Sequence, residues 1–226
     1  RGGPVQEVRA THDAENVYLR VRVTPELWTQ QRIVIGLDAH RGGNDGLPGT
    51  RGADPDADVA VVITPDGPAR IFHAAWNEAL GMRYGGFANP TDRFVKARRA
   101  DLQRGSGTWV PLRQLINYPV KIPATGETRT TEVRDASELP WGSHDPSDPD
   151  FDDRHLIMGR DDTLEIAIPW GMMTFADPSS HTVYEFRLVP DREKQTVPVP
   201  IDQLGISVAV GDGSTTLNTS GYRWKP

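Results

Sequence analysis

Apolar and polar residues alternate along several short segments of the chain, which is the pattern of a β-strand that buries one face. Residues 17–23 place four apolar side chains on one face of such a strand and Tyr18, Arg20 and Arg22 on the other. Similar short apolar segments recur to the end of the chain. The predicted strands are 17–23, 32–38, 58–63, 163–168, 183–189 and 204–210, with weaker signals at 93–97, 107–110 and 128–133.

Turn residues connect two of these strands in a recognisable way. Residues 58–63 are followed by the sequence TPDGP and then by a second apolar segment, 69–73. An Asp-Gly step between two apolar runs is typical of a tight β-hairpin, which we predict here. Helical periodicity is scarce, and only 25–31, 74–82 and 112–117 have room for a turn or two of helix.

Many strands without long helices between them favour an all-β fold. We expect one domain over residues 1–226, built as an antiparallel β-sandwich of the jelly-roll or immunoglobulin-like type. The 22 glycines and 19 prolines fit a chain with many turns. Two long loops are expected at 38–57 and 134–160, and residues 98–160 are expected to form an insertion between sandwich strands.

Charge and composition exclude several classes of protein. The chain carries 31 acidic and 25 basic residues, so its formal net charge of -6 argues against a nucleic-acid partner. It has no cysteine, which excludes disulfides and thiolate chemistry, and no apolar run near the roughly 20 residues of a membrane span. The chain starts at Arg1 without a signal-peptide pattern, and we interpret it as a piece of a longer protein.

Short catalytic motifs are absent from the sequence. It contains no phosphate-binding GxxxxGK[ST], no GxGxxG after a strand, no GxSxG and no HExxH, and its six histidines are scattered. The prediction is therefore a domain without catalytic machinery of its own. Paired-carboxylate enzymes have no short signature, so a glycoside hydrolase using Glu78 and Glu165 stays an alternative.

Two acidic clusters are candidates for a calcium ion. One covers 54–58 and the other 145–153, and both contain alternate aspartates. Calcium binds six to eight oxygen ligands in irregular geometry, which a curled loop of this kind can supply. The denser cluster is preferred, while Asp38, Asn44 and Asp45 are able to act with the first. The predicted calcium ligands are Asp145, Asp148, Asp150 and Asp152.

Two tryptophans lie among polar residues and are candidates for binding sugar rings. Aromatic faces stack on the C–H bonds of a sugar while polar neighbours reach its hydroxyl groups. Trp170, Trp109 and Trp224 are expected to belong to the core. The predicted carbohydrate-binding residues are Trp76, Asn77, Glu78, Arg83, Tyr84 and Trp141.

Several segments, taken in order, resemble the family 9 carbohydrate-binding modules and the wider DOMON-like β-sandwiches. THDAENVYLRVRV is similar to an early family segment in which an aspartate precedes a strand of the type D-x-x-x-L-Y-L-x-V-x-V. RIVIGLDAHRGG and ADVAVVITPDG resemble the next two strands, and LGISVAVGDG resembles a late one. TLEIAIPWGMM is similar to a late E-hydrophobic-x-I-P-W strand. The matching positions are Asp13, Asn16, Tyr18, Leu19, Val21, Val23, Glu165, Ile166, Ile168, Pro169 and Trp170.

The resemblance covers about a third of the chain and implies an accessory domain of a secreted or cell-surface bacterial protein. Such modules bind polysaccharides or oligosaccharides, several hold structural calcium, and they accompany other domains of the same chain. The alternative is a structural or interaction domain without a ligand. Some DOMON-like domains hold haem, for which Met82 and His73 are available axial ligands here, and Met158, Met172 and Met173 are equally available.

Overall fold

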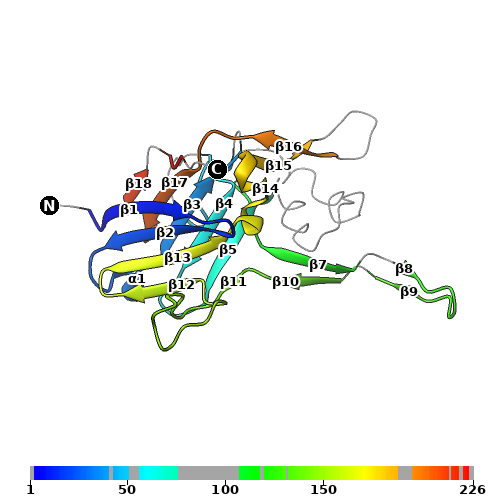
Figure 1. The fold of residues 1–226 in the computed structure, drawn as a ribbon, viewed down its shortest axis with the longest axis horizontal. Helices are drawn as coiled ribbons and strands as arrows, with labels where there is room; N and C mark the ends of the chain where they lie inside the picture. The colour runs from blue at the N-terminus through cyan, green and yellow to red at the C-terminus, as the bar shows by residue number, and fades with distance from the viewer. Residues whose placement is uncertain are drawn as a thin grey trace.

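The computed structural model of the chain is mostly β, with several antiparallel sheets and one short α-helix. Figure 1 shows the arrangement of the strands. No helix among the described residues is long and apolar enough to cross a membrane. The structure describes residues 3–40, 43–50, 56–75, 107–117, 120–130, 132–187, 195–213, 215–218 and 221–223.

The first main sheet has four strands in the order β1-β2-β13-β12. Their bounds are Val5–His12, Asn16–Val23, Thr163–Pro169 and Ile157–Arg160. All neighbours are antiparallel, and Arg20 of β2 lies opposite Glu165 of β13. The alternation of β2 is confirmed, because Val17, Leu19 and Val21 are buried while Arg20 is exposed.

The second main sheet has the order β11-β5-β4-β3-β17-β18, with β6 also paired to β5. The predicted hairpin between β4 and β5 is confirmed, since Val61 lies opposite Ile71 across the Asp66–Gly67 turn. The bounds are β3 Ile33–Asp38, β4 Val59–Ile63, β5 Ala69–Ala74, β6 Trp109–Pro111, β11 Glu138–Leu139, β17 Gly205–Val210 and β18 Thr215–Asn218.

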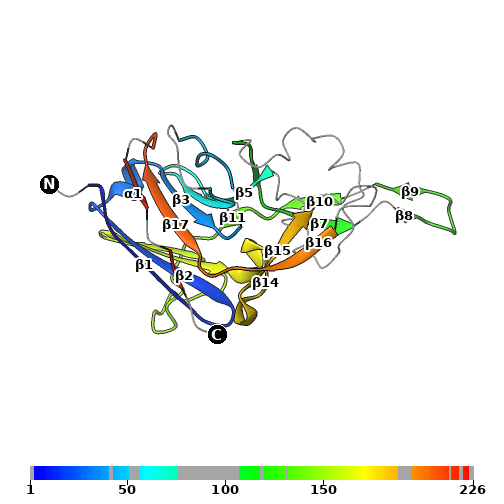
Figure 2. The same ribbon diagram turned by 90° about the horizontal axis from the view of Figure 1, so that it is seen from above.

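One cluster of buried side chains joins the two main sheets. Leu19 and Ile166 come from the first sheet and Ile35, Val61 and Ile71 from the second, and none of the five is more than 1% exposed. The two sheets lie face to face in Figure 2. Burying an aliphatic side chain of this size contributes about 1.5–3 kcal/mol, so this shared cluster is the main source of stability.

Strands β3 and β4 are buried on both faces, although their alternation predicted strands with one buried face. The outward side chains Val34, Ala60 and Val62 pack against Leu47 and Ala57, which belong to the expected loop 38–57. Gly36 permits this close packing, because a Cβ there would lie 2.4 Å from Leu47 Cδ2. The described part of the loop therefore covers the second sheet.

Three smaller sheets complete the described chain. A three-stranded sheet contains β14 (Phe175–Asp177), β15 (Thr182–Arg187) and β16 (Gln195–Pro200), and lies after the short 3-10 helix η3 (Trp170–Met173). A long two-stranded ribbon projects from the body (Figures 1 and 2). It consists of β7 (Arg113–Asn117) with β10 (Glu132–Asp135) and, beyond them, β8 (Val120–Lys121) with β9 (Thr128–Arg129).

Of the short helical segments that the sequence predicted, one is confirmed and one is wrong. Helix α1 (Leu27–Gln30) lies inside the predicted 25–31, but 112–117 is wrong as a helix, because it contains β7. Pairing with β10 decides its conformation, which local periodicity does not show. The segments 93–97 and most of 74–82 lie outside the described residues.

The described part of the expected 98–160 insertion is not a separate unit. Strands β6 and β11 extend the second main sheet, and β12 is the edge of the first. The part that leaves the body is the ribbon between β7 and β10, whose strands pair with each other and with neither main sheet. The rest of the described insertion is part of the body of the fold.

Candidate functional site

The candidate site is a groove on the outer face of the first main sheet. Its cover is the segment 140–156, called the cover loop, which leaves β11 of the second sheet and enters β12 of the first. Two cavities, of about 440 and 600 Å³, lie between the cover loop and the sheet. Both are lined by Tyr18 and His144, so they adjoin, and together they form the groove.

The smaller cavity has a mostly apolar lining, and its charged residues are balanced in sign. The Arg20 side chain forms an ion pair with Glu165 from the next strand, and its Nε donates to Glu165 Oε1 over 2.7 Å. Arg9 and Asp145 complete the charged lining. This end of the groove offers guanidinium donors and carboxylate acceptors side by side, which is what a hydroxyl-rich ligand requires.

Tyr18 stands between the two cavities and is held in place by a turn. Its hydroxyl donates to Asp13 Oδ2 over 2.7 Å, and Asp13 Oδ1 accepts from the backbone N–H groups of Glu15 and Asn16. Partial burial opposes ionisation of Asp13, but the hydrogen bonds from Tyr18, Asn16 and Glu15 hold its pKa below the usual range. Asp13 is therefore an ionised anchor that orients the Tyr18 ring.

His144 faces Tyr18 from the cover loop. The two rings lie 6.5 Å apart and are tilted by 36°. Burial lowers the pKa of His144, so its imidazole is neutral near pH 7 and has both a donor and an acceptor nitrogen. The pair presents two aromatic rings with polar ends to the same groove.

The larger cavity is acidic. Glu15 and Asp153 line it from opposite walls, the turn before β2 and the cover loop, and no Lys or Arg lines it among the described residues. Phe151 adds an apolar ring that is 43% exposed. This half of the groove combines an exposed apolar ring with two acidic side chains.

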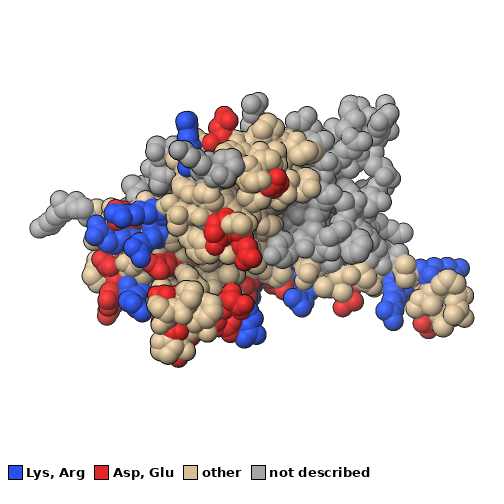
Figure 3. All heavy atoms as spheres, viewed as in Figure 1, with Lys and Arg blue, Asp and Glu red and all other residues tan. Residues whose placement is uncertain are grey.

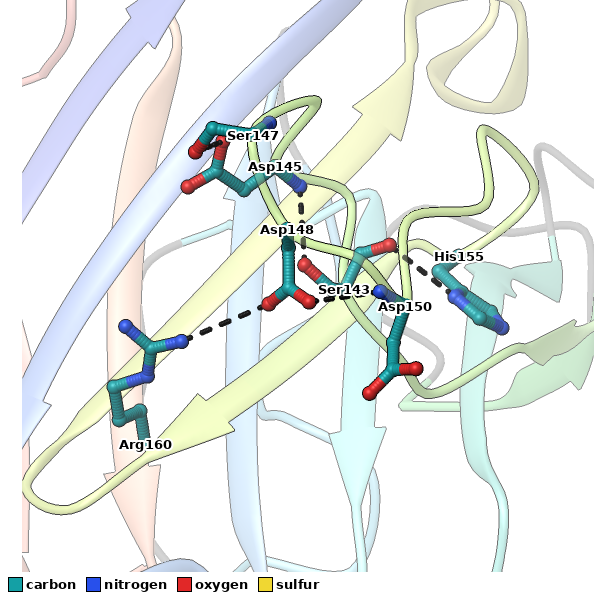
Figure 4. Close-up of polar contacts among 7 residues, drawn as sticks. All are labelled: Ser143, Asp145, Ser147, Asp148, Asp150, His155 and Arg160. Carbon is teal, nitrogen blue, oxygen red and sulfur yellow. Dashed lines mark hydrogen bonds and ion pairs between the residues drawn. The ribbon is translucent and has the colours of Figure 1, made fainter.

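The predicted calcium ligands shape the cover loop through their own hydrogen bonds (Figure 4). Asp145 Oδ1 accepts from the N–H and hydroxyl groups of Ser147, and Asp148 Oδ1 accepts from the N–H of Asp150. Such bonds are the usual turn-forming role of aspartate. Among the described residues, no three His, Cys, Asp or Glu side chains lie where they would hold a metal ion.

Two arginines also interact with carboxylate groups of the cover loop. Asp148 lies 3.8 Å from the guanidinium of Arg160, and Asp152 accepts from Arg154 Nε over 2.9 Å. The hydrogen bonds from Arg154 hold the pKa of Asp152 far below its usual range. The four predicted ligands therefore act separately, at successive turns.

Gly142 allows the cover loop to fold back on itself. Its φ of 150° is one that L side chains rarely adopt, and a Cβ there would lie 2.2 Å from Nδ1 of His155. His155 Nδ1 lies 3.2 Å from the Ser143 carbonyl oxygen, and the His155 side chain lines the larger cavity. The glycine thus positions one wall of the groove.

Trp141, a predicted sugar-binding residue, lies at the base of the cover loop. Its ring stacks on Trp28 of α1, with centroids 5.5 Å apart and planes 29° apart, and both rings pack against the core. Neither tryptophan lines the two cavities described above. Trp170 is buried as expected, and Trp109 is half-buried.

Replacing Trp141 with alanine is expected to lower the free energy of unfolding by about 2 kcal/mol, because a half-buried stacked ring is lost. Chemical denaturation followed by far-UV circular dichroism measures this change. Phe151→Ala, which removes an exposed ring from the same loop, is the control and is expected to cost under about 0.5 kcal/mol. Equal stabilities of the two variants would contradict the packing role of Trp141.

Comparison with family models, with curated proteins and with solved structures finds no match to this chain. The function of this chain is therefore inferred from the groove and from the residues that line it. Five predicted carbohydrate-binding residues lie outside the described residues, namely Trp76, Asn77, Glu78, Arg83 and Tyr84. Met82, one of the four methionines available for haem, lies there too.

A second polar group is buried where the second main sheet meets the three-stranded sheet. Asp58 is fully buried, and its Oδ2 accepts from the N–H groups of Ala39 and His40 and lies 3.2 Å from His40 Nδ1. On its other side, His40 Nε2 lies 3.1 Å from the Tyr184 carbonyl oxygen and 3.3 Å from Thr174 Oγ1. His40 thus links β3 and β4 to β14 and β15.

Two further titratable groups surround this linkage. Burial and the nearby charges of Asp58 and Asp56 raise the pKa of Asp38 to about 7. Complete burial lowers the pKa of His73 to about 4, so this imidazole is neutral at physiological pH. The whole group is packed inside the fold, away from the groove.

The sequence analysis named Asp145 as a calcium ligand and Glu165 as a residue of the hydrolase alternative, but it predicted none of the groove-lining residues as a sugar contact, although one signal was available. Tyr18 is the aromatic residue on the outward face of an alternating strand, where charged residues otherwise stand. His144, Phe151 and Asp153 become site residues only because the cover loop lies over that strand.

Proposed function

We propose that this chain is a non-catalytic module that binds carbohydrate in the groove between the first main sheet and the cover loop. The observation that carries the proposal is the placement of Tyr18 and His144, two aromatic rings with polar ends, in both adjoining cavities. Rings of this kind stack on sugar faces, and the carboxylates and guanidinium groups beside them match sugar hydroxyls.

An accessory role fits the rest of the molecule. The two main sheets share one core, which supports an antiparallel β-sandwich of the DOMON-like type as the architecture. Glu165 forms an ion pair with Arg20, so it is not an unengaged carboxylate available for acid–base catalysis. We infer a secreted or cell-surface location and a polysaccharide or oligosaccharide as the partner.

Tyr18→Ala is expected to weaken glycan binding by about tenfold or more, because a central aromatic contact is lost. A panel of soluble glycans is first screened by thermal shift, and affinities are then measured by titration calorimetry. The control is Tyr184→Ala, which removes a 37% exposed ring that lines neither of the two cavities. Unchanged affinity in Tyr18→Ala, or no binding to any glycan, would argue against the groove.

Structural calcium in the cover loop is the second part of the proposal. Its expected result is a lower melting temperature in EDTA and recovery when calcium is added, because a bound ion would offset repulsion among the aspartates. Magnesium serves as the control cation. A melting temperature that is the same in EDTA, calcium and magnesium would contradict calcium binding and would indicate that the loop keeps its conformation without a bound ion.

The alternative function is a structural or interaction domain, and the ribbon is the observation that favours it. Ile116 and Val120, at 45% and 54% exposure, are two of the four exposed large hydrophobic residues among the described part of the chain. A two-stranded ribbon is marginally stable alone in water, so contact with a neighbouring domain would stabilise it.

A further inference from the structure

The charged residues of the groove are divided unequally between its two cavities. In the smaller cavity two arginines, Arg9 and Arg20, and two acidic residues, Asp145 and Glu165, line the wall, so the formal charges balance, and Arg20 is paired with Glu165. In the larger cavity the described lining contains Glu15 and Asp153 but no Lys or Arg, and its two histidines are His144 and His155. A ligand that fills both cavities therefore meets a neutral half and a negative half.

The surroundings of the larger cavity add to this negative charge. The cover loop contains five aspartates, one arginine, Arg154, and no lysine, together with the histidines His144 and His155. The Arg154 side chain is 82% exposed and is engaged with Asp152, which balances its charge outside the cavity. Lys and Arg side chains are visible elsewhere, for example at the far end of the ribbon (Figure 3). The field in the larger cavity therefore disfavours carboxylated or sulfated sugars and favours a cation.

We propose that the groove selects glycans with free amino groups, meaning hexosamine units whose amine is protonated. This inference rests on the proposed glycan function and adds the chemical class of the sugar. The ammonium group would lie in the larger cavity near Glu15 and Asp153, and the ring faces would contact Tyr18 and Phe151. A protonated amine donates charge-assisted hydrogen bonds to carboxylates. An acetylated amine carries no charge and does not form them.

The test compares two oligosaccharides of equal length by titration calorimetry at pH 6. One is a hexamer of β-1,4-linked glucosamine, and the other is its fully N-acetylated form. The glucosamine hexamer is expected to bind at least about tenfold more tightly at low salt. This preference is expected to shrink as salt rises to about 0.5 M, because exposed charges are screened.

Two double variants test whether the preference for the glucosamine hexamer depends on the larger cavity. Glu15→Gln with Asp153→Asn is expected to reduce the affinity for the glucosamine hexamer to that of the N-acetylated hexamer. Asp66→Asn with Glu127→Gln removes the same charge from exposed positions outside the groove and is expected to keep the preference. Loss of the preference in this control would overturn the assignment to the larger cavity.

The other outcomes are distinguishable. Equal binding of the two hexamers would overturn the amine preference and leave the glycan function standing. Failure of these hexamers and of every other glycan in the panel would overturn the glycan function itself. Equally tight binding of a lysine hexapeptide would overturn the inference in favour of non-specific capture of cationic chains.

Discussion

Replacing His40 with alanine is expected to lower the free energy of unfolding by about 3 kcal/mol, the lower end of the range for leaving a buried carboxylate without its side-chain partner. The side chains of His40 and Asp58 are only 1% and 0% exposed. Alanine would leave the Asp58 carboxylate buried without its imidazole neighbour. The two backbone N–H groups that donate to Asp58 would remain, which is why the loss is placed at the lower end.

The same variant is expected to loosen the three-stranded sheet. Thr174 is a β-branched residue with a φ of 64°, a strained conformation that its surroundings must maintain. Its hydroxyl lies beside His40, and its carbonyl accepts from the Tyr184 N–H over 2.9 Å. Hydrogen exchange of β14 and β15 should therefore speed up more than that of β1 and β2.

Urea denaturation measures the stability change, and two variants control for it. His40→Ala combined with Asp58→Asn is expected to cost less than His40→Ala alone, because no buried charge is then left unpaired. His155→Ala, a half-buried histidine in the cover loop, is expected to cost about 1 kcal/mol or less. A double variant less stable than His40→Ala would show that the charge is not the cause.

Replacing Trp170 with alanine is expected to lower the free energy of unfolding by about 3–5 kcal/mol and to weaken glycan binding as well. The Trp170 ring is 3% exposed and packs against Phe175, with ring centroids 4.6 Å apart. Its indole N–H donates to the Asp13 carbonyl oxygen, and its backbone N–H donates to the Glu15 carbonyl oxygen, each over 3.0 Å. Trp170 therefore holds the turn that orients Tyr18.

Two variants separate these effects. Trp170→Phe keeps an aromatic ring but loses the indole N–H, so it is expected to retain more stability than Trp170→Ala. Trp109→Ala removes a half-buried ring whose indole N–H donates to the Gly46 carbonyl oxygen, on the second sheet and away from the groove. It is expected to lower stability without changing glycan affinity after correction for the unfolded fraction. Equal loss of binding in both alanine variants would remove the link between Trp170 and the groove.

Local pattern was sufficient for the strands and their faces. The alternation in 17–23 correctly placed Leu19 inside and Arg20 outside, because the side chains of a strand point to opposite faces in turn. The Asp66–Gly67 turn correctly predicted the pairing of β4 with β5, since the turn geometry is encoded by two neighbouring residues. Trp170 was correctly placed in the core by its position at the end of an apolar strand.

Predictions that depended on distant parts of the chain were less successful. Residues 112–117 lack strand alternation but form β7, because β10 pairs with them. Trp141 looks like an exposed loop residue in the sequence, yet it stacks on Trp28, more than a hundred residues earlier. The aspartates of the cover loop resemble a calcium site in composition, while the directions of Asp145 and Asp148 depend on turns in which each carboxylate accepts from a nearby N–H.

The sequence by itself determined a mostly β, antiparallel chain, the buried and exposed faces of β2 and the absence of cysteine chemistry. Only the tertiary structure decided that β2 pairs with β13, that the cover loop lies over their outer face, and that Tyr18 and His144 meet there. The physical reason is the separation along the chain of the residues that interact. Side-chain alternation and turn preferences act between neighbouring residues, whereas a groove is made by segments that come together only when the whole core forms.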